Sequence, residues 1–525
     1  MARRPNAPGM FGRTPCDVGA IKGLKSTKAG QENAGRYVLV ATILASSMVF
    51  IDGSVVNVVL PVLQADLHAN AIELQWIVVG YTLFLSSLML VGGSLGDHYG
   101  RRRIFVAGVI LFASASMVCG IAPNATLLIV ARCIQGVGSA MLTPGSLALI
   151  GATFDASERG KAIGTWSSVT AVMAAIGPGL GGYLAQHASW RWIFYINVPL
   201  AIAVVVVALR GVPESKDRER VHVVDWPGAI ACTSGLGAIV YGLTFGVLGW
   251  VAAGICGLVA FTYIESRSPA PLVPLRLFAS RTFSGVNALT LCLYGALGGA
   301  LFFLPFEMIQ IDGYSPTAAG FAFLPFVLFM FVLSPIAGGL VPKIGARLPL
   351  VVGPLITGAG FIVLGMSVGR DGFGSYWTTY LPAIVLMGVG MATAVAPLTT
   401  VVMESVDADR MGAASGVNNA ISRVAGMLAI AVFGALILNV FSGHLQRDMD
   451  AMRVPEGVRS AVFEDRYALA ETNAPARTDS AMKVVVRMAV TDAYVSAFRM
   501  TMFVCAGLAA AGALIAGLTI EPRKA

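Results

Sequence analysis

The sequence predicts an all-α, multi-pass membrane protein. Of its 525 residues, 56% are hydrophobic and only 12% are charged, whereas a soluble protein carries about 25% charged residues. The mean hydropathy is +0.76. The apolar residues fall into separate long runs with few charges, and runs of about 18 or more such residues are typical of transmembrane helices. These observations exclude a large soluble enzyme with an oversized core.

The apolar runs predict fourteen membrane-spanning helices. Each run is long enough, at ~1.5 Å per residue, to cross ~30 Å of hydrocarbon. The seventh and eighth runs are separated by little more than Gly-Val-Leu, and we expect a tight hairpin because 227–265 is too long for one crossing. The predicted spans are 37–63, 72–94, 104–122, 126–150, 162–186, 192–210, 227–245, 248–265, 284–306, 316–339, 349–368, 379–403, 413–440 and 497–519.

Basic residues gather in alternate short loops. The loops after the even-numbered spans up to the twelfth hold 15 Lys and Arg residues, with Arg210 at the edge of the sixth span included, whereas the loops after the odd-numbered spans hold 2. Because basic short loops stay in the cytoplasm, we expect a cell-membrane protein with both termini inside. The net charge of +8 therefore reflects topology, and no nucleic-acid partner is expected.

A short internal repeat indicates two related bundles. The segments "GSLGDHYGRR" (93–102) and "GGLVPKIGAR" (338–347) each follow a predicted span on the same side of the membrane. Aligning them places Gly100 opposite Gly345, although Pro342 stands opposite Asp97. Long helical membrane proteins are often built from such repeats.

The repeat predicts four parts of the chain. They are a disordered basic cytoplasmic tail (1–36), an N-terminal six-helix bundle (37–210), cytoplasmic linkers with an inserted helix pair (211–282, with helices 227–245 and 248–265), and a C-terminal six-helix bundle (283–520). The last part includes a long extracytoplasmic loop, 441–496, which is nearly neutral and ends in an amphipathic stretch suited to a surface helix. A packed cap and a plain connector both remain open for this loop.

Two opposite charges are predicted at similar depth in the first bundle. Asp52 lies roughly 15 Å and Arg132 roughly 10 Å from the outer ends of their spans, at ~1.5 Å per residue. Charged groups at such depth face a bundle interior or a wet cavity and tend to pair. One interpretation is a static ion pair that fixes helix packing. The other is a carboxylate that gains and loses a proton during function.

Two further segments combine residues with distinctive chemistry. In "GGSLGDHYGRRR" (92–103), the arginines hold the loop at the inner face, and Asp97 can pair with a nearby arginine or with the N-terminus of a facing helix. In "GPGLGG" (177–182), Pro178 permits a kink and the glycines permit close helix contact. The phenylalanines of "LFFLPFEMIQ" and "FAFLPFVLFMF" are expected mostly to face lipid.

Six segments in order resemble motifs of the major facilitator superfamily and its fourteen-helix drug:proton antiporter branch (EmrB/QacA-like). The resemblance covers the chain from about residue 37, and His98 departs from the usual Arg or Lys of the loop motif. The segments are "FIDGSVVNVVLP" (50–61), "GSLGDHYGRRR" (93–103), "ARCIQGVGSAMLTP" (131–144), "GPGLGG" (177–182), "SWRWIFYINVP" (189–199) and "ASGVNNAISRVAG" (414–426).

The resemblance implies a proton-coupled exporter of apolar or amphipathic small molecules that works by alternating access. It implies a role in proton coupling for Arg132, and Asp52 is the carboxylate expected to act with it. It implies a conformational latch formed by the loop motif and a sealing role for the glycine motif. The latch residues are Gly93, Asp97, Gly100, Arg101 and Arg102, and the antiporter motif residues are Gly177, Pro178, Gly181 and Gly182.

Other classes of function find less support in the sequence. No HExxH and no GxxxxGK[ST] motif occurs, and the five histidines fall in loops or at predicted helix edges. We therefore expect no enzyme activity, no cofactor and no metal site. The seven scattered cysteines suggest neither a disulfide framework nor a zinc site. The expected partners are a small-molecule substrate, protons and the lipid bilayer. An importer, a non-transporting sensor and accessory export subunits remain open alternatives.

Overall fold

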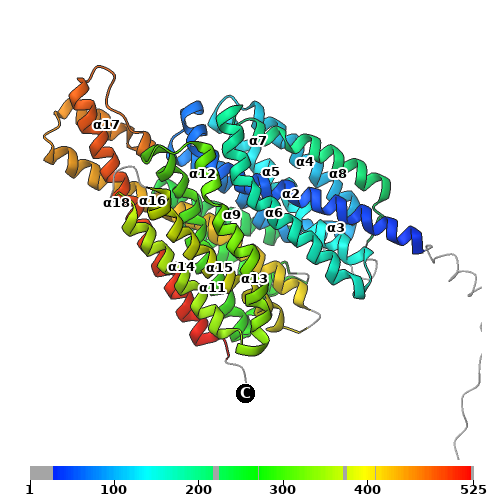
Figure 1. Ribbon diagram of the computed structural model, residues 1–525. Coiled ribbons are helices and arrows are strands. Elements are labelled where there is room, and N and C mark those ends of the chain that lie inside the picture. The colour runs from blue at the N-terminus through cyan, green and yellow to red at the C-terminus, as the bar shows by residue number, and fades with distance from the viewer. Residues whose placement is uncertain (1–27, 217–223, 270, 370–374, 408–409, 522–525) are drawn as a thin grey trace, which may run out of the picture.

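The computed structural model describes residues 28–521 except 217–223, 270, 370–374 and 408–409. Over these residues the secondary structure is helical, and fourteen helices are long and apolar enough to cross a membrane. This confirms the predicted all-α fold with fourteen spans. Figure 1 shows the helices running side by side in two groups, with a helical projection around α17 at one end. The predicted tail lies mostly outside the described residues, but residues 28–36 already belong to the first helix.

The N-terminal bundle contains the first six spans. Its helix starts follow local sequence: Asn70 precedes α3 and accepts a hydrogen bond from the Glu73 backbone N–H, while the Glu73 side chain accepts one from the Asn70 N–H. The helices are α2 (Lys28–Leu67), α3 (Ala71–Tyr99), α4 (Arg101–Ile121), α5 (Ala125–Thr153), α6 (Ala156–His187) and the pair α7 (Trp192–Tyr195) and α8 (Asn197–Gly211), which together form the sixth span.

The C-terminal bundle contains the last six spans, two of which carry a π-helical turn. A short 3-10 helix, η1 (Leu275–Ala279), leads into it. The spans are α11 (Arg281–Phe306) with the π-turn η2 (Glu307–Ile311), α12 (Pro316–Ala322) with α13 (Leu324–Ile344), α14 (Arg347–Ser367), the π-turn η3 (Tyr376–Tyr380) with α15 (Leu381–Glu404), α16 (Met411–Ala451) and α18 (Ser480–Thr519).

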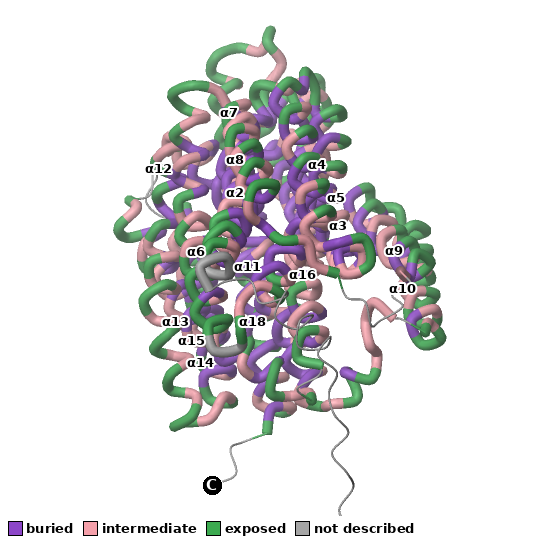
Figure 2. Tube along the Cα trace, turned by 90° about the vertical axis from the view of Figure 1, so that its right-hand side faces the viewer, coloured by how far each residue is buried: buried purple, intermediate pink, exposed green. Residues whose placement is uncertain are grey.

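The inserted pair is a hairpin, as expected. Helix α9 (Trp226–Phe245) and helix α10 (Leu248–Arg267) are joined at Gly246, whose φ of 69° lies in the left-handed region that glycine adopts readily. Trp76 of α3 lies 6.4 Å from Tyr241 of α9, measured between ring centroids. Figure 2 shows that the pair lies beside the bundles, and within α10 only Gly254 and Glu265 are buried.

The predicted long loop is largely helical. Helix α16 runs on to Ala451 and α18 already begins at Ser480, so both extend beyond the predicted spans. At ~1.5 Å per residue, 40 residues reach ~60 Å, twice the hydrocarbon thickness. The residues between them, 452–479, are here called the cap and include α17 (Glu456–Glu464) and the 3-10 helix η5 (Asp465–Glu471). The amphipathic stretch predicted as a surface helix is thus the first part of α18.

The cap is packed rather than extended. Val462, Leu469 and Ala470 are buried, and the Gln64 amide of α2 donates to the Ala468 carbonyl at 3.0 Å. The membrane end that carries the cap is here called the cap side. Figure 1 places the start of α2 and the end of α18 on the opposite side.

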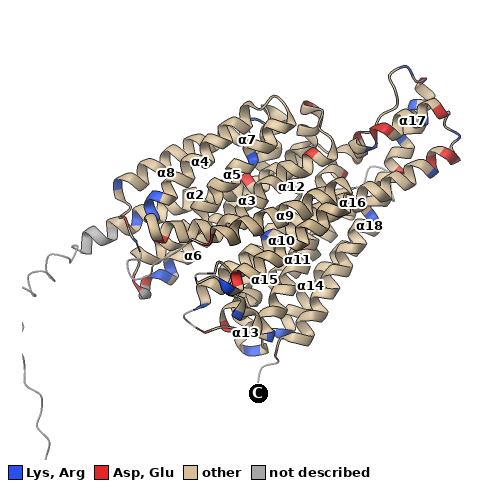
Figure 3. Cartoon of the chain, turned by 180° about the vertical axis from the view of Figure 1, so that it is seen from behind, with Lys and Arg blue, Asp and Glu red and all other residues tan. Residues whose placement is uncertain are grey.

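The internal repeat appears in the backbone. Gly100 (φ 115°) separates α3 from α4, and Gly345 (φ 77°) separates α13 from α14. An arginine follows in each copy, Arg101 at the first residue of α4 and Arg347 at the first residue of α14. Figure 3 shows charged residues gathered near helix ends and in the cap, with the middle of most helices free of them.

The expectation that the phenylalanines face lipid is wrong for one segment and partly right for the other. Phe302, Phe303 and Phe306 are buried, because they fill the space where α11 meets α2 and α3. Phe321 and Phe331 are each 54% exposed.

Candidate functional site

A buried ion pair joins two helices of the N-terminal bundle. The Arg132 Nη1 of α5 donates to the Asp52 Oδ2 of α2 at 2.5 Å, and both side chains are 1% exposed. The structure thus brings together the two charges that the sequence places at similar depth. The guanidinium carbon also lies 4.1 Å from the centre of the Tyr81 ring of α3, which adds a cation–π contact.

Neutral polar groups complete the bonding of this pair. The Gln135 Nε2 donates to Asp52 Oδ1 at 2.9 Å, and the Asn197 Nδ2 of α8 reaches the same oxygen at 3.3 Å. Arg132 also donates to the Gln135 Oε1 at 2.8 Å and to the Ile77 carbonyl at 3.2 Å. The groups bonded in this site therefore come from four helices, α2, α3, α5 and α8, and the Asp52 carboxylate is bonded through both oxygens. Such bonding is what makes a buried charge pair tolerable.

Gln135 and Asn197 were missed by sequence reasoning as members of the site. Gln135 lies three residues after Arg132 and so on the same helix face, which is the signal that could have identified it. Asn197 lies within the resembling segment 189–199, but nothing local connects it to Asp52. Its Nδ2 also donates to the Ser116 Oγ of α4 at 3.0 Å, so that one amide links three helices.

The loop-motif residues are bonded within the N-terminal half. The Arg101 Nε donates to Asp97 Oδ1 at 2.8 Å, and the Arg101 Nη2 lies 2.8 Å from the same oxygen. A Cβ added to Gly93 would make only an ordinary contact with Pro144, at 3.6 Å. The Arg102 backbone N–H donates to Glu214 Oε1 at 3.0 Å, and its Nη1 donates to the Val212 carbonyl at 3.1 Å.

Glu214 is a second acid at this turn, and sequence reasoning did not single it out. A Cβ on Gly100 would lie 2.8 Å from the Glu214 carboxyl carbon. The turn therefore needs glycine for space as well as for its positive φ.

The glycine motif of α6 lies between the two bundles. A Cβ on Gly177 or Gly181 would lie 2.0 Å from Ser54 Oγ or 2.7 Å from Val55 Cγ1, both on α2. A Cβ on Gly182 would lie 2.1 Å from the Pro316 carbonyl oxygen of α12, and one on Gly320 would lie 2.3 Å from the Pro178 carbonyl oxygen. Absent side chains therefore allow α6 to touch both α2 and α12 with its backbone.

The two bundles join on the cap side. The Gln310 Nε2 of η2 donates to the Gln64 Oε1 of α2 at 2.9 Å, and the Thr317 N–H donates to the Gln186 Oε1 at 3.3 Å. The cap-side half of the N-terminal bundle shares one apolar core with the C-terminal bundle, whereas its other half has a core of its own. On that other side, Ile336 of α13 is 55% exposed. The apolar core that the two bundles share thus lies on the cap side.

Gly182 of α6 allows a direct test of this closure. Gly182→Ala places a methyl group against the Pro316 backbone, and overpacking of this kind costs about 1–3 kcal/mol. If the motif has the sealing role that the resemblance implies, we expect transport to fall several-fold while the protein still accumulates in the membrane, because the strain falls on one conformational state. The matched control is Gly164→Ala on the same helix, where nothing lies within 4 Å of the added Cβ. Equal transport rates for the two variants, measured in membrane vesicles, would contradict the sealing role.

Comparison with known proteins identifies the family. Residues 42–430 match the model of the Major Facilitator Superfamily. The chain is 34% identical to the multidrug resistance protein Stp of Mycobacterium tuberculosis (strain CDC 1551 / Oshkosh), over 82% of this chain and 80% of that protein. It is 34% identical to the puromycin resistance protein pur8 of Streptomyces alboniger, over 85% and 88%. It is 30% identical to the drug efflux pump JefA of the same M. tuberculosis strain, over 93% and 98%.

The fold agrees with this result. A bacterial homolog of the human lysosomal transporter Spinster, solved in an inward-facing and unoccupied conformation, superimposes with a TM-score of 0.65. It covers 94% of this chain and 98% of its own at 18% identity, which establishes likeness of fold alone. From the matched family model, the relatives and the fourteen spans, the chain belongs to the Major Facilitator Superfamily, whose members are membrane transporters and not enzymes.

Proposed function

We propose that this transporter exports an apolar or amphipathic small molecule across the cell membrane in exchange for protons. The observation that carries the proposal is the set of relatives, which are at least 30% identical over four-fifths or more of this chain and are named for drug efflux or for drug resistance. Among the described residues, no group of three or more His, Cys, Asp or Glu side chains could hold a metal ion.

The orientation follows from the basic loops. With the loops after the even-numbered spans in the cytoplasm, both termini are cytoplasmic and the cap faces outward. The bundles are then closed toward the outside and apart toward the cytoplasm. In alternating access this is the state that accepts cargo from the cell, and export requires the opposite arrangement to form.

Proton coupling is assigned to Asp52 and Arg132. In the present state the carboxylate is bonded on both oxygens and sealed from water, so a proton cannot reach it. Protonation requires that the pair separate, which ties proton binding to a rearrangement of α2 against α5. A static structural pair is the competing interpretation, and the double variant in the Discussion separates the two.

The test uses inverted membrane vesicles that contain the transporter. Uptake of puromycin, lincomycin and tetracenomycin C, which are compounds in the names of Streptomyces relatives of this chain, is measured with an imposed pH gradient, acidic inside, and again after a protonophore has collapsed the gradient. The proposal predicts that at least one compound, here called the exported compound, is taken up only with the gradient. Uptake undiminished by the collapse contradicts proton coupling. Movement of every tested compound only in the reverse direction favours an importer, and no movement of any of them favours a sensor.

The latch is assigned to Asp97 and the start of α16. Helices α3 and α16 pack antiparallel, because Gln75 lies against Gly434 and Leu90 lies against Gly416. The ends of these two helices that lie away from the cap side carry Asp97 on α3 and the first turn of α16. Among the described residues no side chain caps that turn, and the backbone N–H groups at the N-terminus of a helix attract a carboxylate. In the present state Asp97 is bonded to Arg101 instead. We expect the contact to form when the cytoplasmic side closes.

Replacing Asp97 by asparagine should slow export without weakening binding of the exported compound. A carboxylate at a helix N-terminus is worth up to ~2 kcal/mol, which changes a conformational population by about five- to thirtyfold. We expect the maximal rate to fall by that factor and the half-saturating concentration to stay within about twofold. Initial rates in inverted vesicles measure both. Unchanged rates, or a selective loss of affinity, would contradict the latch.

A further inference from the structure

Glu307 is a fully buried acid that neither the ion pair nor the latch uses. It is the first residue of the π-turn η2, which continues directly from α11. Its side chain is 0% exposed, and among the residues that the structure describes neither carboxyl oxygen has a hydrogen-bond partner. π-turns interrupt the regular bonding of a helix and are frequent at functional sites.

The surroundings of Glu307 disfavour a negative charge. Two charged groups act on it electrostatically: Asp312 of the same loop, which repels it, and Arg499 of α18, which attracts it. The Arg499 guanidinium, however, donates to the Gly365 and Val368 carbonyls at 3.0 Å each. An ionised carboxylate without a partner in an apolar interior costs several kcal/mol or more. Burial without a partner therefore favours the neutral acid in this state.

The tyrosines that face Glu307 provide no countercharge. Tyr494 of α18 is close enough for the charge of Glu307 to act on it, and its own hydroxyl has no hydrogen-bond partner among the described residues. The charge of Glu307 also acts on Tyr380 of η3, whose hydroxyl donates to Asp312 Oδ2 at 2.6 Å. Both phenols are neutral groups, so they leave the protonated form of Glu307 as the favoured one.

The same π-turn holds the contact between the bundles. Gln310, three residues after Glu307, donates to Gln64 of α2, and its backbone carbonyl accepts from Arg487 Nη2 at 2.8 Å. Arg487 also donates to the Ala470 carbonyl of the cap at 2.6 Å. When the cap side opens, the Gln64–Gln310 contact must break, and the turn that buries Glu307 loses its neighbour.

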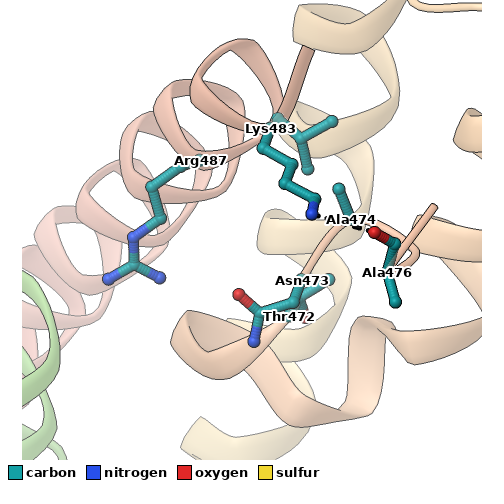
Figure 4. A pocket seen from close by; sticks show the side chains of 7 residues that line it. Thr472, Asn473, Ala474, Ala476, Lys483 and Arg487 are labelled. Atoms are coloured by element: carbon teal, nitrogen blue, oxygen red, sulfur yellow. Dashed lines mark hydrogen bonds between the residues drawn. The ribbon is translucent and has the colours of Figure 1, made fainter. Parts of the chain in front are cut away.

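Space for water adjoins this turn on the cap side. A cavity of about 280 Å³ is lined by Lys483 and Arg487 of α18 and by the cap residues Thr472, Asn473, Ala474 and Ala476 (Figure 4). A cavity of this size with polar walls holds several water molecules. Arg487 thus borders the cavity and also bonds Gln310, so the water that takes up a proton on opening and supplies one on closing lies beside the turn.

We propose that Glu307 is a proton-binding site whose occupancy closes the cap side of the transporter. In the open state the carboxylate meets water and is ionised. Transfer of one proton from a hydronium ion in that water to a carboxylate oxygen leaves a water molecule and gives the neutral acid, which can then be buried. Since the closed state binds one proton more than the open state, acid favours closure and alkali favours opening. The inference rests on the alternating access of the proposed function and deepens it.

The test measures opening directly and needs neither cargo nor gradient. Spin labels are placed at Ala188, beyond the end of α6, and at Ser460 on α17, in the full-length chain with its native cysteines replaced. The distance distribution between the labels reports separation of the bundles on the cap side. In the wild-type background we expect the ratio of long to short distances to rise with pH, by up to about tenfold per pH unit over the range where Glu307 titrates.

Glu307→Gln should abolish this pH dependence and hold the short distance at every pH, because glutamine mimics the neutral acid. The control is Glu404→Gln, which removes an exposed acid at the end of α15 and should leave the dependence intact. Infrared spectra of the same proteins should show a protonated carboxylic acid at neutral pH that Glu307→Gln removes. A wild-type distance ratio independent of pH, or the same pH dependence in Glu307→Gln, would overturn the proposal. Either result leaves the gradient-driven export test unaffected.

Discussion

Replacing Asp52 by asparagine is expected to abolish gradient-driven export while exchange of the exported compound down its own gradient continues. Asparagine nearly preserves the shape of the side chain but cannot be ionised or take up the coupling proton. The measurement compares uptake into inverted vesicles with a pH gradient and counterflow of the same compound without one. We expect gradient-driven uptake to fall to the background of empty vesicles and counterflow to persist within several-fold of wild type.

The double variant Asp52→Asn with Arg132→Gln separates coupling from simple packing. The single variant leaves the Arg132 charge buried without its counterion, so it loses stability as well as function. The double variant removes both charges and should recover much of the lost stability. Our account predicts that it still lacks gradient-driven uptake. Recovery of that uptake would show that the pair is structural and that another acid carries the proton.

Replacing Arg132 by alanine is expected to be the most destabilising of these substitutions. It removes the guanidinium from a carboxylate that is 1% exposed, and breaking a buried pair from one side costs about 3–5 kcal/mol. The cation–π contact with Tyr81 and the bond to the Ile77 carbonyl are lost as well. We expect a marked loss of thermal stability in purified protein and no gradient-driven export.

The control for this prediction is Arg191→Ala on the surface of the same bundle. Arg191 Nη1 lies 2.9 Å from Asp66 Oδ2, but the two side chains are 34% and 48% exposed. Exposed pairs contribute about 0–1 kcal/mol because water and ions screen them. We therefore expect only a small change in melting temperature. Similar losses in the two variants would contradict the view that the Asp52–Arg132 pair is held by a desolvated, tightly bonded site.

The sequence was sufficient for the fold because membrane insertion depends on simple rules. The thickness of the hydrocarbon sets the length of an apolar run. Such a run forms a helix, because a helix pairs its backbone N–H and C=O groups internally and leaves none unpaired in lipid. The same rules do not apply beyond the lipid. The predicted spans therefore end at 440 and begin again at 497, although α16 runs to Ala451 and α18 begins at Ser480. Polar helical turns outside the membrane carry no hydropathy signal, so these boundaries could not be predicted.

The candidate site was only partly predictable, for a related reason. Asp52 and Arg132 are conspicuous because charges are rare at that depth, and their depths follow from residue spacing alone. Asn197 and Glu214 are recognised only when segments far apart in the chain are packed together, whereas Gln135 could have been identified from its place on the same helix face as Arg132. Glu307 is visible in the sequence as an acid near the end of a span, but its complete burial depends on the π-turn and on contacts from α18 and η3.

Proton movement driven by the exported compound tests the central claim most directly. Purified transporter is reconstituted into liposomes that enclose a pH-sensitive dye, with no pH gradient at the start. A gradient of the exported compound is then imposed across the membrane. We predict that protons move in the direction opposite to the compound in wild type, and that this movement is absent from liposomes carrying the Asp52→Asn, Arg132→Gln double variant. Transport of the compound by wild type without any accompanying proton movement would contradict the account.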